Sequence, residues 1–286
     1  MKIAHCATEH FFAKYEFTTP YQLCNSDCET LTIEELLDLA GVSFADFGKL
    51  SLGYTESQGN PMLREAIASG YQNVQPDEVI ELGSPIEGIY LAARATLNPG
   101  DEVVVLCPAY DALINMFEHV VGAGNVKRWR FKPGLIQWEL DFNELEILIT
   151  PQTKMVVVNF PHNPTGFLPS ASQVEQVINT VNKRELLLFC DEMYFGLVHA
   201  GTPSIPSVAD GCQRAVVLSG LSKTYGLPGL RSGWLIIHDR EKVVYYGEDG
   251  KWAIIDQDNQ GRVLSIQPYG AYINNLAHIK KIEVKS

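Results

Sequence analysis

The chain has 286 residues, of which 46% are hydrophobic and 20% are charged, a composition typical of a globular protein with one large core or two lobes. Its formal net charge of -12, with no stretch rich in Lys and Arg, argues against nucleic acid and anionic membrane surfaces as partners. Six sparse cysteines do not form a disulfide framework, so we expect a cytoplasmic, reducing compartment.

Metal binding and membrane insertion are also not expected. Cys24 and Cys28 are four positions apart, but no further Cys or His pair completes a zinc spacing. The opening segment interrupts its apolar residues with charged ones such as Glu9 and Lys14, unlike a signal-peptide core. No apolar run approaches the ~20 residues that cross a bilayer.

Helix-like and strand-like segments alternate from about Asn60 onward. "NPMLREAIASGYQN" has a proline in its first turn and apolar residues on one side, which predicts a helix. "DEVIELG" predicts a short strand, and "PIEGIYLAARATLN" predicts a helix that ends at "PGD". "EVVVLCP" then predicts a buried strand that ends at a proline.

Four later segments are apolar at consecutive positions: "KMVVVNF", "ELLLFCDE", "AVVLSG" and "GWLIIHD". This pattern predicts strands covered on both faces. A helical pattern, "ASQVEQVINTVNKR", lies between the first and the second of them. Interleaved strands and helices predict an α/β fold with a mostly parallel sheet sandwiched by helices.

The last part of the chain has a different pattern. From Arg240 onward, strand-like runs alternate with turn signals at 248–250 and 259–261, which predicts a β-hairpin. We therefore expect an N-terminal segment over residues 1–45, a large domain over 46–239 and an atypical tail over 240–286.

Polar loops follow several predicted strands, where open α/β sheets bind ligands. "GSPIEG" opens a helix whose free N–H groups suit a phosphate. "CPAYDAL" places Tyr110 where its ring could stack on a flat ligand, although a core tyrosine is the commoner role. "FPHNPTG" surrounds Asn163 with two prolines and a glycine, which fix the shape of that loop.

Two further loops carry charge. Asp191 in "CDEMY" follows a buried strand, where a carboxylate needs a cationic partner, and Tyr194 returns to the same side after one helical turn. Lys223 in "LSGLSKTYGLPGLRSGW" lies among small residues, where a lysine can lose its proton and attack a carbonyl. Arg231 offers a bidentate fork for a phosphate. A solvated lysine and an ion-paired arginine are the alternative interpretation.

The motifs "HNPTG", "DEMY" and "SKTYGLPGLRSG", in this order, resemble those of the class I/II aminotransferases of fold type I, which depend on pyridoxal 5'-phosphate (PLP). "YTESQGNPMLREAIA" and "NPGDEVVVLCPAY" resemble upstream segments of the same family, so the resemblance covers roughly residues 54–238. It implies a seven-stranded sheet in the large domain, PLP as the cofactor, and transfer of an amino group between an amino acid and a 2-oxo acid.

The resemblance also implies a role for each site residue. Lys223 forms an imine with the cofactor aldehyde and moves a proton at the substrate carbon, while Asp191 pairs with the pyridinium nitrogen. Asn163 and Tyr194 hydrogen-bond the phenolic oxygen of the ring. Lys223, Asp191 and Tyr194 are the expected catalytic residues. The remaining cofactor contacts fall to Ser84, Pro85, Ile86, Tyr110, Ser219, Ser222 and Arg231.

A homodimer is implied as well, because Tyr54 resembles the tyrosine that reaches the phosphate in the neighbouring subunit. The same resemblance implies a cis bond between Asn163 and Pro164.

Two departures from the family pattern affect this interpretation. Gly220 stands where the family often has a phosphate-binding serine, and Ser219 lies one position earlier. The missing hydroxyl costs one hydrogen bond to the phosphate, on the order of 1 kcal/mol of binding free energy, so cofactor binding should survive. Only 63 residues, 224–286, follow Lys223, and those after Arg240 do not resemble the family's C-terminal lobe, which grips the substrate carboxylate.

Several alternatives therefore stay open. One is a truncated, catalytically impaired remnant that only binds PLP, and another is a PLP-dependent lyase or decarboxylase of the same fold. A Rossmann-type nucleotide binder is not favoured, because no G-x-G-x-x-G turn follows the first strand.

Overall fold

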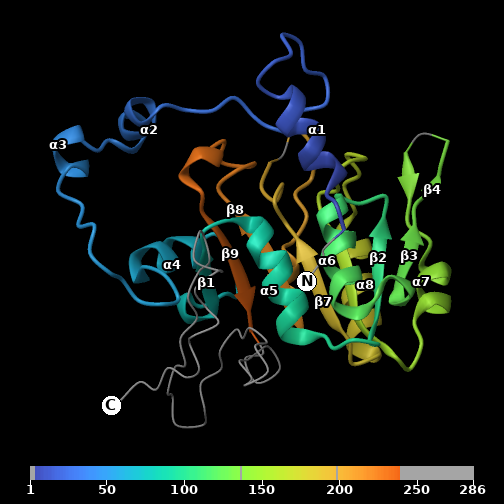
Figure 1. Cartoon of the computed structure of the whole chain (residues 1–286). Coiled ribbons are helices and arrows are strands. Elements are labelled where there is room, and N and C mark those ends of the chain that lie inside the picture. Colours follow the sequence, from blue (N-terminus) through green and yellow to red (C-terminus); the bar gives the residue numbers. More distant parts are fainter. Residues whose placement is uncertain (1–3, 136, 198, 239–286) are drawn as a thin grey trace, which may run out of the picture.

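A seven-stranded sheet in the order β1-β9-β8-β7-β6-β2-β3 forms the centre of the computed structural model, which describes residues 4–135, 137–197 and 199–238 (Figure 1). Its strands are β1 (Val79–Leu82), β2 (Glu102–Cys107), β3 (Val126–Arg130), β6 (Thr153–Asn159), β7 (Leu187–Asp191), β8 (Ala215–Gly220) and β9 (Gly233–Ile237). A small two-stranded sheet pairs β4 (Lys132–Pro133) with β5 (Trp138–Glu139). The prediction of a mostly parallel sheet is confirmed, since the pairs from β3 to β8 are all parallel.

Helices cover both faces of this sheet. The helices of the described residues are α1 (Ala7–Tyr15), α2 (Ile33–Ala40), α3 (Phe44–Phe47), α4 (Pro61–Ala68), α5 (Pro85–Thr96), α6 (Asp111–Val121), α7 (Phe142–Leu148), α8 (Ala171–Lys183) and α9 (Val208–Gly211). Three 3-10 turns are η1 (Pro76–Glu78), η2 (Ala123–Asn125) and η3 (Pro228–Leu230). Helices α5 and α6 pack on one face, and α4, α7, α8 and α9 pack on the other (Figure 1).

The strands are buried on both faces, as their consecutive apolar residues predict. In β2, Val103 and Val105 face the core under α5 and α6, whereas Val104 and Leu106 face the core on the opposite side. All four side chains are at most 2% exposed. This rigid double-sided core fixes the carboxyl ends of the parallel strands, from which the predicted site loops project.

Strand β9 runs antiparallel to both of its neighbours, β8 and β1, a reversal that the sequence analysis did not predict. The connection 221–232 between β8 and β9 contains η3 but no crossover helix, so it cannot return the chain in the parallel direction. Gly220, the last residue before the connection, pairs with Gly233, the first residue after it. Both ends of the loop that carries Lys223 are therefore anchored in the sheet.

The N-terminal segment reaches over the sheet before α4 begins. Helix α1 lies above the strand ends, whereas α2 and α3 lie away from the sheet, at the left of Figure 1. Cys6 Sγ and the Thr8 N–H both donate to the carboxylate of Asp111, at 2.9 and 3.1 Å, which ties α1 to the start of α6. Apolar side chains of this segment are largely exposed, among them Phe17 and Leu52.

None of the helices in the described ranges is both long and apolar enough to cross a bilayer. The β-hairpin expected after Arg240 lies outside the described residues.

Candidate functional site

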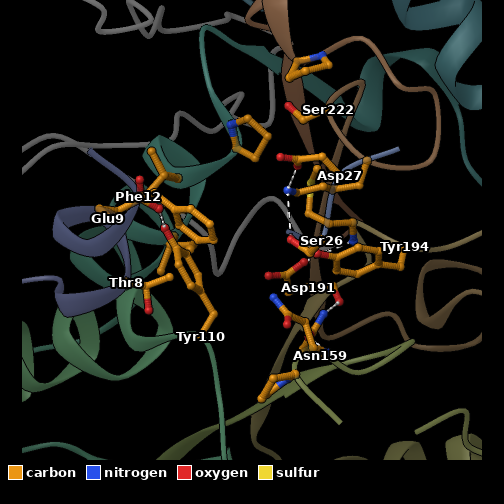
Figure 2. Close-up of a pocket in the computed structure, with 18 of the residues that line it drawn as sticks. Thr8, Glu9, Phe12, Ser26, Asp27, Tyr110, Asn159, Asp191, Tyr194 and Ser222 are labelled. Carbon is orange, nitrogen blue, oxygen red and sulfur yellow. Dashed lines mark hydrogen bonds and ion pairs between the residues drawn. The ribbon is translucent and has the colours of Figure 1, made fainter. Parts of the chain in front are cut away.

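A cavity of about 760 Å³ opens where β6, β7 and β8 end and α5 begins (Figure 2). It brings together most of the residues that the sequence singled out: Ser84, Pro85, Ile86, Tyr110, Asn163, Asp191, Tyr194, Ser222, Lys223 and Arg231. Its volume is in the range of small-molecule sites. Residues of the N-terminal segment complete its wall, which the sequence analysis did not anticipate.

Two predicted cofactor contacts do not line this cavity. Ser219 is buried in β8, and its hydroxyl donates to the backbone oxygen of Glu192 at 3.2 Å. Tyr54 is fully exposed, so its expected contact with a neighbouring subunit stays a prediction.

The glycine at position 220 has a packing reason. A Cβ atom there would lie 2.7 Å from Pro85 Cγ and 3.0 Å from the backbone oxygen of Ser232. A serine has no room at this position unless the start of α5 moves.

Asn159, the last residue of β6, connects two of the site loops. Its side-chain amide donates to the backbone oxygen of Asp191 at 2.7 Å, and its side-chain oxygen accepts from the N–H of Asn163 at 2.7 Å. Asn159 and Asp191 are partners in the parallel register of β6 and β7. The same loop has cis peptide bonds before Pro161 and Pro164, the second of which the family resemblance implied. Asn159 was not predicted from the sequence as a site residue, although its place at a strand end was a usable signal.

Asp191 is a buried carboxylate that needs a cationic partner. Its side chain is 7% exposed, and its Oδ1 accepts a hydrogen bond from the Met193 N–H at 3.1 Å. Burial raises the pKa of Asp191 to about 6, even though that hydrogen bond and the charge of Lys223 act in the opposite direction. A protonated nitrogen placed against this carboxylate would remove much of the cost of its burial.

Lys223 is held by the N-terminal segment. Its Nζ forms an ion pair with the carboxylate of Asp27 and donates to Ser26 Oγ at 3.1 Å. Burial raises the pKa of Tyr194, and the nearby Ser26 side chain and the charge of Lys223 act in the opposite direction. Figure 2 shows Ser26 and Asp27 beside Tyr194 and above Asp191. No local sequence signal pointed to this contact, because Asp27 lies 196 positions before Lys223.

The start of α5 provides a site for an anion at the other end of the cavity. Ser84 is the N-cap of this 12-residue helix, but its side chain makes no capping hydrogen bond. Its hydroxyl instead accepts from Arg231 Nη2 at 3.1 Å. Arg231 has a left-handed backbone, with φ of 51°, uncommon for a residue other than glycine. The guanidinium, the hydroxyl and the positive end of the helix dipole all favour an anionic group here.

Tyr110 precedes α6 and forms part of the opposite wall. Its hydroxyl donates to the Glu9 carboxylate of α1, so the ring is fixed at the cavity edge (Figure 2). Burial is the main cause that raises the pKa of Tyr110, and the hydrogen bond to Glu9 adds to it. The phenol therefore stays neutral, and its flat face is available for stacking. As a whole, the cavity suits a flat ligand with a protonated ring nitrogen at one end and an anionic group at the other.

Comparison with known proteins identifies relatives of the chain. The sequence pattern of the family described as "Aminotransferase class I and II" matches residues 21–266. "Aspartate aminotransferase" of Sulfurisphaera tokodaii is 31% identical over 197 residues, which are 67% of this chain and 49% of that protein. "Capreomycidine synthase" of Streptomyces vinaceus is 29% identical over 231 residues, covering 80% of this chain and 58% of that protein.

The fold has solved counterparts as well. The crystal structure of a PLP-dependent aminotransferase from Streptococcus suis superimposes with a TM-score of 0.77 at 26% identity, covering 85% of this chain and 64% of that one. The chain spans about half the length of the curated relatives that it matches first, namely 49%, 47% and 50% of them.

Proposed function

Because the chain belongs to the class I and II aminotransferase family, whose members use pyridoxal 5'-phosphate, we propose that it binds this cofactor in the cavity and transfers an amino group between an amino acid and a 2-oxo acid. The observation that carries the proposal is that Asp191 and Lys223 line one cavity with an anion site at the start of α5. Residues 46–239 are proposed as the cofactor-binding domain.

The residues present fit the cofactor. The buried Asp191 carboxylate, whose pKa is raised to about 6, would pair with the protonated ring nitrogen. Asn163 and Tyr194 would hydrogen-bond the ring oxygen. The start of α5, Arg231 and Ser84 would hold the phosphate, with Ser222 beside them.

The cofactor supplies an aldehyde that joins to amines and a ring that takes up electrons from the substrate carbon. Lys223 Nζ would attach to that aldehyde, which requires a neutral amine and therefore release from Asp27 and Ser26. Once displaced by the substrate amine, Lys223 Nζ would take the proton from the substrate α-carbon and would pass it to the former aldehyde carbon of the cofactor, which keeps the amino group. Asp191 would keep the ring nitrogen protonated throughout.

A homodimer in a reducing, cytoplasmic compartment is also proposed. Exposed apolar side chains in residues 17–54, including Phe17, Leu23 and Leu52, suit a subunit interface better than solvent. Tyr54 lies at the end of this stretch and would reach the partner's phosphate site. The six cysteines are all free thiols, which suits a reducing compartment.

The test is cofactor loading followed by turnover. PLP added to the purified chain should give a visible absorbance band, and reduction with borohydride should leave a mass increase on the Lys223 peptide. The loaded protein should convert amino acids to oxo acids, with loss of that band. If folded protein gives neither band nor mass increase, PLP binding is excluded. If the band forms but no amino acid changes it, amino transfer is excluded.

A further inference from the structure

We propose that the site prefers substrates with a second cationic nitrogen, such as a basic amino acid, and that Asp27 binds this group. The inference rests on the proposed function, because it concerns the same cavity once the cofactor is bound. It follows from two separate observations, the charges that remain in the cavity and the group that Asp27 holds in this structure.

The charged residues that line the cavity are four acids and two bases in the described part of the chain: Glu9, Glu16, Asp27, Asp191, Lys223 and Arg231. The cofactor would engage Asp191 at its ring nitrogen, Lys223 at its aldehyde and Arg231 at its phosphate. Among the described wall residues, the charged ones left for the substrate are then Glu9, Glu16 and Asp27, which are all acidic. The negative potential of these carboxylates stabilises a bound cation and destabilises a bound acidic side chain.

These three carboxylates come from one part of the fold. Glu9 is in α1, Glu16 is the C-cap directly after that helix, and Asp27 follows in the loop toward α2. Figure 2 shows Glu9 on one side of the cavity and Asp27 on the other. A ligand in the space between them would have an acidic group on each side, so the N-terminal segment would set the charge preference.

Asp27 already binds an ammonium group in this structure. Its carboxylate forms an ion pair with Lys223 Nζ, and Ser26 Oγ accepts from the same nitrogen at 3.1 Å. The Asp27 side chain is 35% exposed, so it is partly shielded and still reachable from the cavity. When Lys223 attaches to the cofactor, its ammonium is no longer available, and Asp27 and Ser26 are left with an acceptor site for another one.

The experiment compares ligands that differ in this one group. Cofactor-loaded protein is titrated with L-ornithine and with L-norleucine, which replaces the terminal ammonium with a methyl group; L-glutamate and putrescine complete the set. Binding is read from the cofactor absorbance and, independently, by calorimetry. A charge-assisted hydrogen bond predicts that ornithine binds about tenfold or more tightly than norleucine. Glutamate should bind more weakly than norleucine. Putrescine, which lacks a carboxylate, separates a diamine substrate from a basic amino acid.

Three variants locate the effect. Asp27→Asn keeps the shape of the side chain and should remove most of the ornithine preference while norleucine binding stays within about twofold. Ser26→Ala should reduce the preference partially. Glu34→Gln, in the exposed first turn of α2, removes a charge of the same segment outside the cavity and should leave the preference unchanged.

Loaded protein that binds ornithine and norleucine equally overturns this inference and leaves the proposed function intact. Asp27→Asn that weakens both ligands alike assigns Asp27 to the positioning of Lys223 instead. If no cofactor loads, the proposed function fails, and the inference fails with it.

Discussion

Replacing Asp191 with asparagine is expected to stabilise the cofactor-free chain and to weaken cofactor binding. The substitution keeps the size of the side chain and an oxygen that can accept from the Met193 N–H. It removes the buried negative charge. In the absence of a cofactor, no cation of the described residues contacts that charge directly, because the amine of Lys223 is paired with Asp27.

The size of the effect follows from the pKa of Asp191. Burial raises this pKa from 3.8 to about 6 in the folded chain. One pKa unit corresponds to about 1.4 kcal/mol, so ionisation costs the folded state about 3 kcal/mol above pH 6. Well below pH 3.8 the carboxyl is protonated in both folded and unfolded chains, and the cost vanishes. Between pH 3.8 and pH 6 the unfolded chain releases its proton more readily, so the contribution of Asp191 to the free energy of unfolding falls as the pH rises.

Urea unfolding of cofactor-free protein measures this directly. At pH 8, Asp191→Asn should raise the free energy of unfolding by about 3 kcal/mol, and at pH 4 by less than about 1 kcal/mol. In PLP titrations at pH 8 the same variant should bind at least about tenfold more weakly, because the ring nitrogen loses a charge-assisted partner. A variant that is destabilised at pH 8, or that binds PLP as tightly as the wild type, would refute this role for Asp191.

Three other substitutions test separate parts of the site. Lys223→Ala should abolish the borohydride-dependent mass increase and leave unfolding by urea nearly unchanged; a mass increase on another peptide would contradict the assignment. Gly220→Ser should weaken PLP binding by about tenfold or more, measured by equilibrium dialysis, since its Cβ would lie 2.7 Å from Pro85 Cγ and would displace the start of α5. Unchanged affinity would show that the helix start adapts. Glu192→Ala should cost about 2–5 kcal/mol in urea unfolding, because the Ser207 hydroxyl and the Val208 N–H, each 2.7 Å from the carboxylate, lose their buried acceptor; a cost below about 1 kcal/mol would contradict this.

The sequence predicted the parts of the fold that depend on local pattern. The strand from Thr153 to Asn159 was recognisable because its apolar residues are consecutive, as burial on both faces requires. Helix α8 was recognisable because Val174, Val177 and Val181 recur at helical spacing. Most of the loops that follow such strands meet in one cavity because the carboxyl ends of parallel strands share one edge of the sheet.

The parts that depend on tertiary contacts were not predictable in this way. The reversal of β9 had one sequence signal, the lack of a helical pattern in residues 221–232, but the direction of a strand leaves no mark on its own residues. Ser219 and Ser222 look equivalent as polar residues near Lys223. The alternation of β8 nevertheless turns Ser219 toward the backbone of Glu192, while Ser222 lies past the strand end and faces the cavity. The contact of Asp27 with Lys223 joins segments that are 196 positions apart, so no local sequence pattern could predict it.

Cofactor binding would give one carboxylate of the site a cationic partner and would take the cationic partner away from another. Asp191 is buried and contacts no cation among residues 4–135, 137–197 and 199–238, so it would gain one from the ring nitrogen, whereas Asp27 holds the ammonium of Lys223 and would lose it. The gain occurs at a buried site, where a charge pair is weakly screened, and the loss occurs at a partly exposed site, where it is strongly screened. The exchange should therefore favour the loaded state. It also leaves the uncompensated negative charge on Asp27 in the cavity wall, where a substrate cation rather than the cofactor can neutralise it.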